Sequence, residues 1–215
     1  RLTSLQGGDV GGLTDKAKKD ITLLEKGVPV DYVIGHKNFC GCKIDLREKP
    51  LIPRDETEFW IKQLIKNLRG SDSSKFIGEG SLKVLDMFAG SGCCGIAVLK
   101  AIPKSHCDFV DVEDSCLKQI KFNLKLNSID KKRYKVIKSD IFEKLKWKAC
   151  PERAKRVEGY DLILANPPYI GLGEKKKVQE SVLNFEPKKA LFAKNNGLYF
   201  IEQFLKQAKN YLNPQ

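Results

Sequence analysis

Four short apolar stretches in the C-terminal part of the chain are predicted to be buried strands, and helical patterns separate them. The strands are LKVLDMF, CDFVDVE, YKVIKSDIF and YDLILAN, and the patterns after the first two are GSGCCGIAVLKAI and DSCLKQIKFNLKLN. Strands that alternate with helices build a parallel sheet with helices on its faces. The order therefore predicts an α/β fold with a Rossmann-like parallel sheet, followed by a helix in NNGLYFIEQFLKQAKNYL.

The N-terminal part is predicted to form a small helix followed by a β-hairpin. LTDKAKKDITLLEKG has a helical pattern that ends at Gly27, and alternation around a glycine-containing turn indicates a hairpin from about Tyr32 to Ile52. We therefore expect two parts, with residues 1–53 as the appendage and residues 54–215 as the sheet domain. Four parallel strands would leave a sheet edge bare, so further C-terminal strands are expected to be missing from this sequence.

RDETEFWIKQLIKNL is predicted to be the helix that opens the second part. Asp55 and Glu58 have the spacing of a capping box. The apolar side chains that fall close to one face of this helix are Phe59, Leu64, Ile65 and Leu68. The polar stretch 70–81 and the charged stretch EKLKWKACPERAKRVEG are expected to be loops.

The composition excludes several classes of protein. With 41% hydrophobic and 31% charged residues, and no apolar run of about 18 residues, the chain is neither disordered nor membrane-spanning. Seven cysteines without C-x-x-C pairs at zinc spacing indicate reduced thiols in an intracellular compartment. Because two histidines are too few for a histidine-based site, we predict no metal.

The net charge of +12 has two interpretations. A lysine-rich surface keeps a protein in solution, and it also suits a phosphate-rich partner such as a ribosome, RNA or DNA. Aromatic residues are seldom interleaved with the lysines, so we favour the first interpretation and treat nucleic-acid or ribosome contact as not required. A basic chain also suits the mitochondrial matrix. The chain starts at Arg1 and no targeting sequence is visible, and a processed or truncated N-terminus could have removed one.

The fourth predicted strand runs directly into Asn166, Pro167, Pro168 and Tyr169. Prolines fix φ and remove backbone donors, and a residue that precedes proline is held in an extended conformation. The result is a rigid polar loop at the carboxyl end of a strand, which is where ligands bind in open α/β sheets.

A glycine turn, VLDMFAGSGCCGIA, joins the first strand of the sheet to its helix. Gly90 and Gly92 allow the backbone to approach a ligand closely, and the helix N-terminus favours a carboxylate or phosphate. Phe88 occupies the position of the first glycine in G-x-G-x-x-G. By itself the turn fits a dinucleotide site and plain tight packing alike.

Acidic residues end the next two strands. Asp111 lies about 20 residues on, where a carboxylate can hold a ribose diol, although a helix N-cap is the alternative role. Asp140 could accept from an adenine amino group, with Ile141 and Phe142 as apolar walls, or could belong to a surface turn. Three strand ends that each carry a group suited to a nucleoside favour the nucleoside interpretation for all three.

These motifs together resemble a class I AdoMet-dependent methyltransferase. The resemblance rests on strand–DMFAGSG–helix, on Asp111 and Asp140, and on N-P-P-Y. N-P-P-Y is the signature of enzymes that methylate a planar amide-like or exocyclic nitrogen. They include DNA adenine, some ribosomal RNA guanine and protein glutamine methyltransferases, so the motif indicates the chemistry and leaves the substrate open.

Flanking sequence is similar to the HemK/PrmC family, which methylates peptide chain release factors. Residues 29–58, PVDYVIGHKNFCGCKIDLREKPLIPRDETE, resemble its hairpin linker, and residues 185–208 resemble its segment after N-P-P-Y. R-x-E-T-E is the release-factor version of this motif. The minimal eukaryotic cytosolic relatives lack the hairpin, so the resemblance implies an organellar or bacterial enzyme. We expect the mitochondrial form, with the bacterial cytoplasm as the alternative location.

Two positions depart from the family pattern. Phe88 replaces the usual glycine, which affects the backbone path at the first turn position. Asp55 replaces the usual proline, which loosens the loop that leads to Glu56 and Thr57.

The resemblance implies AdoMet as cofactor, with S-adenosyl-L-homocysteine as product, and a release factor as protein substrate. The residues expected to bind AdoMet are Phe88, Ala89, Gly90, Ser91, Gly92, Asp111, Asp140, Ile141 and Asn166. The residues expected to bind the substrate are Arg54, Glu56, Thr57, Asn166, Pro167, Pro168 and Tyr169, of which the last four form the catalytic motif.

We expect the Asn166 Oδ1 atom and the Pro167 carbonyl to accept the two N–H bonds of the acceptor amide. Tyr169 would pack on the flat face of that amide. Arg54, Glu56 and Thr57 would help to close the pocket, and Glu186-Pro187 would support the N-P-P-Y loop. The predicted reaction is methylation of the glutamine amide in the Gly-Gly-Gln motif of a release factor, which affects translation termination.

Two other functions are compatible with parts of this pattern. A ribosomal RNA or DNA exocyclic-amine methyltransferase would also carry N-P-P-Y and a charge of +12, but no added recognition domain is evident. A non-catalytic AdoMet-binding protein would tolerate Phe88 and the early C-terminus, but would not need Asn166, Asp111 and Asp140. An NAD-binding Rossmann domain leaves N-P-P-Y unexplained.

Overall fold

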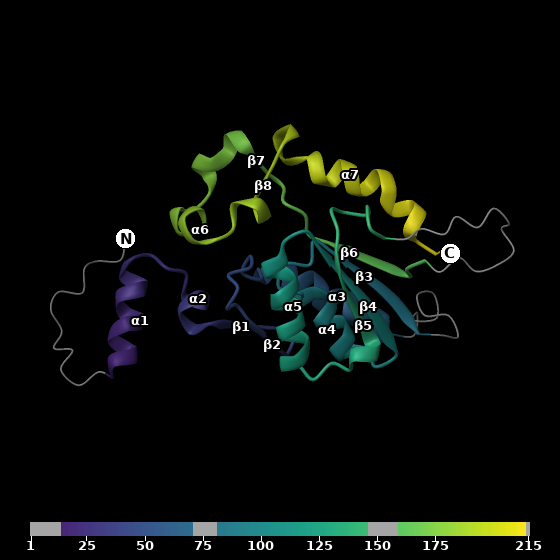
Figure 1. Cartoon of the computed structure of the whole chain (residues 1–215), viewed down its shortest axis with the longest axis horizontal. Helices are drawn as coiled ribbons and strands as arrows, with labels where there is room; N and C mark the ends of the chain where they lie inside the picture. Colours follow the sequence, from purple (N-terminus) through teal and green to yellow (C-terminus); the bar gives the residue numbers. More distant parts are fainter. Residues whose placement is uncertain (1–13, 71–80, 146–158, 214–215) are drawn as a thin grey trace, which may run out of the picture.

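The computed structural model describes residues 14–70, 81–145 and 159–213 (Figure 1). Its centre is a four-stranded sheet with the order β5-β4-β3-β6, in which every neighbouring pair is parallel. The strands are β3 (Leu82–Met87), β4 (Ser105–Asp111), β5 (Tyr134–Lys138) and β6 (Leu162–Ala165). The predicted α/β class and all four predicted strands are therefore confirmed.

Helices cover both faces of this sheet, because β3 is buried on both sides. Leu82 and Val84 point into one cluster, which contains α3 (Asp55–Arg69), α4 (Cys93–Ala101) and α5 (Asp114–Leu126). Leu85 and Met87 point into a second cluster, which includes residues of α7 (Tyr199–Ala208). This is the alternation expected of successive strand side chains, and Figure 1 accordingly shows α7 on the other side of the sheet from α4 and α5.

The N-terminal segment consists of α1 (Asp15–Glu25), α2 (Val30–Ile34) and a hairpin of β1 (His36–Phe39) and β2 (Cys42–Asp45). The predicted first helix is confirmed, with the Thr14 hydroxyl accepting from Ala17 N and Gly27 left-handed at φ 79°. The predicted hairpin is too long, because Tyr32 lies in α2 and Ile52 lies in an extended segment. Gly35 at φ 84° ends α2 and starts the hairpin.

Three buried amide side chains of the α5 region attach the hairpin to the sheet domain. Gln119, Asn123 and Asn127 accept from the backbone N–H groups of Glu48, Asp45 and Lys43 at 2.9, 2.9 and 3.2 Å. Their spacing of four residues places them on one side of the helix. The edge of β2 is thereby satisfied by side chains instead of a further strand.

The helix α3 begins differently from the prediction. Arg54 is its N-cap residue and makes no side-chain cap, so the predicted capping box is wrong. Asp55 instead pairs with Lys37 at 2.8 Å, and the Glu58 carboxylate accepts from Cys40 N at 2.8 Å. Phe59, expected on the packed face, is 66% exposed. Thr57, Ile61 and Leu68 are the buried residues of α3.

The last predicted helix starts later than expected. Asn195, Asn196 and Gly197 have φ values of 52°, 50° and 92°, so the chain turns before α7 begins at Tyr199. A Cβ on Gly197 would collide with the Tyr169 carbonyl, so this position requires glycine. Most of the two predicted loops at 70–81 and 143–159 lies outside the described residues, and within the described part no helix is long and apolar enough to cross a membrane.

We predict that Gly95→Ala destabilises the sheet domain by about 1–3 kcal/mol. Gly95 lies in α4 against β4, where a Cβ would sit 2.5 Å from Phe109 Cε1 and 2.7 Å from Cys107 Sγ. Urea unfolding followed by circular dichroism measures the loss. Gly173→Ala is the control, because nothing lies within 4 Å of a Cβ there. An equal loss in both variants would contradict this packing argument.

Candidate functional site

A cavity of about 540 Å³ lies at the carboxyl ends of the four parallel strands. The loop after each strand contributes to its wall. The wall residues from these loops are Phe88, Ala89, Gly90, Ser91, Asp111, Val112, Glu113, Ser139, Asp140, Ile141, Asn166 and Pro168. Parallel pairing brings these loops together, because Met87 lies opposite both Val110 and Ala165.

The turn after β3 follows a glycine-like path despite Phe88. Phe88 has φ 58° and Gly90 has φ 55°, so both residues are left-handed. The Phe88 ring packs edge-on against Phe200 at 5.9 Å and lies 6.4 Å from Phe204. These contacts stabilise a conformation that is unfavourable for a residue with a side chain.

Gly92 has a packing role. It is absent from the cavity wall, and its Cβ would lie 3.2 Å from Ile120 and 3.3 Å from Ile96. At φ 78° it forms the start of α4. Of the two glycines predicted to approach the cofactor, Gly90 is therefore the one that lines the cavity.

Asp111 connects the loops after β3 and β4. Its carboxylate accepts from Gly90 N at 2.8 Å and from Glu113 N at 3.0 Å. Burial raises its pKa, while these backbone N–H groups lower it. Each carboxylate oxygen retains acceptor capacity beyond these bonds, so Asp111 can hold the turn and still accept from a diol.

Asp86 is a wall residue that the sequence analysis did not identify. It lies inside β3, is 3% exposed, and accepts from Gly95 N at 2.8 Å. Burial and, to a smaller extent, the nearby Asp111 raise its pKa to about 7, against the lowering effect of the Gly95 N–H group. The available signal was a carboxylate within an otherwise apolar strand, directly before a glycine turn.

The loop after β5 presents Asp140 and Ile141 to the cavity. Asp140 is exposed, and its carboxylate bonds to none of the described residues. Ile141 is left-handed at φ 44°, a strained conformation for a β-branched residue. Phe142, expected as a second wall, stacks instead on Tyr211 at 4.3 Å and lies outside the cavity.

Asn166 separates this cavity, which we call the strand-end cavity, from a second one. The second cavity has a volume of about 600 Å³. Asn166 lines both, whereas Pro168 lines only the strand-end cavity and Pro167 and Tyr169 line only the second. The Asn166 carboxamide bonds to no other described residue, so its oxygen is free to accept. Tyr169 is 62% exposed at the second cavity.

The three residues expected to close the pocket are divided between the cavities. Thr57 is buried and lines the strand-end cavity, Glu56 lines the second cavity, and Arg54 lines both. Glu186 lies behind Arg54, accepting from its Nη2 atom at 2.7 Å.

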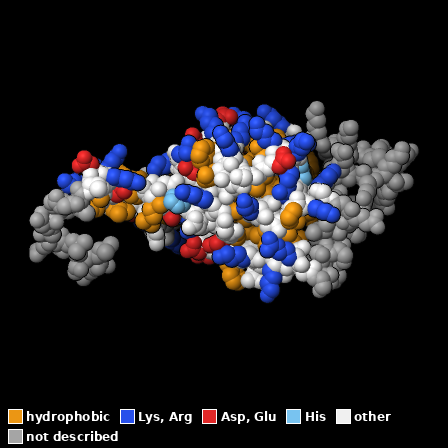
Figure 2. All heavy atoms as spheres, turned by 90° about the horizontal axis from the view of Figure 1, so that it is seen from below, with side chains coloured by type: hydrophobic (Ala, Val, Ile, Leu, Met, Phe, Trp, Pro, Cys, Tyr) orange, Lys and Arg blue, Asp and Glu red, His pale blue; other side chains and the backbone are white. Residues whose placement is uncertain are grey.

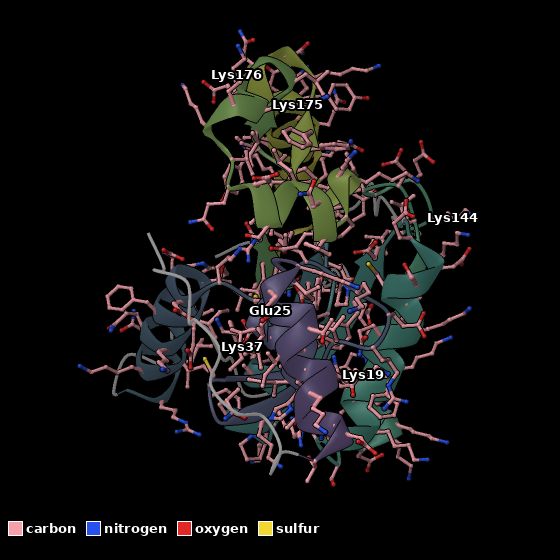
Figure 3. The ribbon with its side chains drawn as sticks, turned by 90° about the vertical axis from the view of Figure 1, so that its left-hand side faces the viewer. Lys19, Glu25, Lys37, Lys144, Lys175 and Lys176 are labelled. Atoms are coloured by element: carbon pink, nitrogen blue, oxygen red, sulfur yellow. The ribbon has the colours of Figure 1, made fainter. Side chains whose placement is uncertain are left out.

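The N-P-P-Y loop is supported by a different segment from the one expected. Ile170 N donates to the Leu191 carbonyl at 3.0 Å, in the short parallel pairing of β7 (Ile170–Gly171) with β8 (Phe192–Ala193). The contacts of Glu186 run to residues 52 and 54. Figure 1 shows this region, with α6 (Glu180–Phe185), above the hairpin, and Figure 3 shows Lys175 and Lys176 at its outer end.

This region also supplies wall residues that the sequence analysis missed. Phe192 and Phe200 line the strand-end cavity, as do Lys188 and Lys189. Lys189 pairs with Glu113 at 2.8 Å, which links this region to the loop after β4. All four residues lie in the segment 185–208, whose family resemblance was the available signal.

Comparison with known sequences agrees with this geometry. Residues 73–213 match the family described as "Methyltransferase small domain". The chain belongs to this family.

Individual relatives are about 30% identical to the chain over the aligned residues. A "Release factor glutamine methyltransferase" from Flavobacterium psychrophilum is 31% identical over 88% of this chain and 61% of its own length. One from Lactococcus lactis is 29% identical over 93% of this chain and 67% of its length. A "Bifunctional methyltransferase" from Rickettsia prowazekii is 32% identical over 89% of this chain and 38% of its own length. The chain thus spans between two fifths and two thirds of these relatives.

Solved structures match the fold. The catalytic domain of hMettl16, solved in complex with MAT2A 3′UTR hairpin 6, aligns with a TM-score of 0.52 at 17% identity. The alignment covers 90% of this chain and 61% of that chain.

We predict that Asp86 makes the free energy of unfolding fall as pH rises. Between the ordinary carboxyl pKa of 3.8 and about 7, folded Asp86 holds a proton that the unfolded chain has lost. Stability is therefore greatest below this window and decreases through it, by about 2–3 kcal/mol between pH 5 and pH 7.5.

Urea unfolding of the wild type and of Asp86→Asn at both pH values measures this contribution. The variant should show a flatter pH dependence, because its carboxamide accepts from Gly95 N without titrating. Identical pH slopes in the two proteins would show that Asp86 is ionised throughout.

Proposed function

We propose that the chain is an AdoMet-dependent methyltransferase whose cofactor occupies the strand-end cavity. The wall supports this assignment, because Asp111 can accept from a ribose diol, and the Asp140 carboxylate, which bonds to none of the described residues, can accept from an adenine amino group. Val112 and Ile141 supply apolar surface beside them. Bound AdoMet would supply an electrophilic methyl group on its sulfonium.

The observation that carries the proposal is the position of Asn166 between two cavities. A carboxamide nitrogen is a poor nucleophile, so the chain must orient it in line with the methyl group. Asn166 Oδ1 and the Pro167 carbonyl accept its two N–H bonds and stabilise the positive charge that develops. Tyr169 packs on the flat face of the amide and excludes water. Arg54 and Glu56 close the second cavity around it, and Thr57 faces the cofactor.

The acceptor we propose is the glutamine of the Gly-Gly-Gln motif in a peptide chain release factor. The printed names of the Flavobacterium and Lactococcus relatives support this substrate, as does the R-x-E-T-E motif at residues 54–58. Methylation of this glutamine would affect translation termination.

We further propose that residues 1–53 are the remnant of a substrate-recognition part and residues 54–215 the methyltransferase part. The three amide contacts between hairpin and α5 support a fixed relation between them. For location we propose the mitochondrial matrix, on the strength of the net charge of +12. The relatives named above are bacterial, which makes the bacterial cytoplasm the alternative.

A ribosomal RNA or DNA exocyclic amine is the second candidate acceptor. Figure 2 shows Lys and Arg side chains over much of one face of the molecule, and such a surface favours phosphate. Asn166 would hold an exocyclic amine through the same two acceptors. Methyl transfer to naked RNA or DNA distinguishes this acceptor from a release factor.

We predict that Asn166→Ala retains AdoMet binding and lowers methyl transfer about 100-fold or more, because the acceptor amide loses its orienting oxygen. Calorimetry measures cofactor affinity, and labelled methyl transfer to a purified release factor measures the rate.

The substrate control is the same release factor with the glutamine of Gly-Gly-Gln replaced. Label on the unaltered factor alone supports the proposed acceptor. Equal losses of AdoMet affinity and rate in Asn166→Ala would argue against the role assigned to Asn166.

A further inference from the structure

A single buried carboxylate holds the wall between the two cavities. The Glu186 side chain is 1% exposed. Its Oε1 atom accepts from Arg54 Nη2 at 2.7 Å, and its Oε2 atom accepts from Ile52 N at 3.0 Å. Both carboxylate oxygens are thus committed to one short segment that lies far away in the sequence.

That segment, residues 49–54, forms a continuous part of the wall of the strand-end cavity. Leu51 and Arg54 also line the second cavity. On its other side the segment is held by Tyr32, whose hydroxyl donates to the Pro50 carbonyl at 2.5 Å. The segment therefore depends on two side-chain anchors, and the Glu186 anchor is the one that includes Arg54.

Arg54 lines both cavities, and its guanidinium has N–H donors that the bond to Glu186 does not use. Its side chain is 34% exposed, and among the described residues Glu186 is the one partner to which this side chain donates a hydrogen bond. A guanidinium carries several further N–H donors in a rigid plane. Since Arg54 and Asn166 line the same two cavities, these donors and the Asn166 acceptor face one region.

Stability alone does not account for this pair. A buried ion pair adds little net stability, because the desolvation of its charges offsets their attraction. The pair does fix the orientation of Arg54, since the buried carboxylate determines where the guanidinium plane lies.

We propose that Glu186 is a positioning residue for methyl transfer, which acts by holding Arg54 at the junction so that the guanidinium orients the acceptor through its carbonyl oxygen. The proposal rests on the function proposed above. It adds a residue, Glu186, that contacts neither AdoMet nor the acceptor amide. Asn166 and Pro167 accept from the amide nitrogen, and Arg54 donates to the oxygen of the same amide.

A double-mutant cycle with Glu186→Gln and Arg54→Met tests the proposal. We expect each single variant to lower kcat/KM for the protein acceptor about tenfold or more, mainly in kcat, with the AdoMet Kd within about threefold of wild type. If Glu186 acts through Arg54, the double variant is no worse than Arg54→Met alone.

Two further variants complete the design. Arg54→Lys keeps a cation beside the buried carboxylate but removes the planar fork, so it should fold like wild type and still lose kcat. Glu180→Gln is the matched control, because Glu180 is an exposed glutamate of α6 and should leave kcat, KM and Kd unchanged. Thermal unfolding of every variant separates loss of folding from loss of positioning.

The outcomes separate the two proposals. Losses that multiply in the double variant, or wild-type kcat in Arg54→Lys, overturn the positioning role while the methyltransferase assignment stands. A wild type that methylates RNA and not the release factor overturns the substrate, and the same cycle is then measured with RNA. A wild type that transfers no methyl group to either overturns both.

Discussion

Parallel pairing of β3 with both β4 and β6 is the constraint on which the rest of this structure depends. It sets Met87 level with Val110 and Ala165, so the residues that follow these three strands emerge at one edge of the sheet. Phe88, Asp111 and Asn166 come from positions far apart in the sequence, and no long side chain is needed to bring them together. The two faces of β3 are filled by different helices, so this edge cannot move without disturbing both hydrophobic clusters.

The sequence predicts those parts of the site that depend on local patterns, such as hydrophobic periodicity and turn residues. The four strands of the sheet, the helices α1, α4 and α5 and the glycine turn follow from periodicity and turn chemistry and lie close to where they were expected. The hairpin is shorter than predicted and α7 begins later. The predictions that fail concern side chains whose contacts are made with residues distant in the sequence. Glu58 bonds to Cys40 instead of capping its helix, Phe142 stacks on Tyr211, and Glu186 holds Arg54 instead of the N-P-P-Y loop. Local spacing carries no information about such partners, so these roles required the tertiary structure.

Charge is distributed unequally between the inside and the outside of the site. Asp86 and Glu186 are buried and Asp111 is half-buried, and backbone N–H groups or Arg54 hold all three. The cationic side chains Lys188 and Lys189 lie at the rim, where Lys189 pairs with Glu113. Asp86 is protonated below about pH 7 and Glu186 is paired with Arg54, so Asp111 and Asp140 are the wall carboxylates that favour a cationic ligand. The lysines leave the surrounding surface open to anionic partners.

The Phe88 turn has a consequence for how this protein can change over time. Phe88 keeps a glycine-like backbone only because its ring is packed against Phe200 and Phe204 of the C-terminal helix. The tolerance of position 88 for a bulky residue is therefore conditional on two residues more than a hundred positions away. In evolutionary terms the three sites are epistatic. We expect phenylalanine at position 88 to be tolerated only together with this aromatic pocket, and glycine to be favoured there without it.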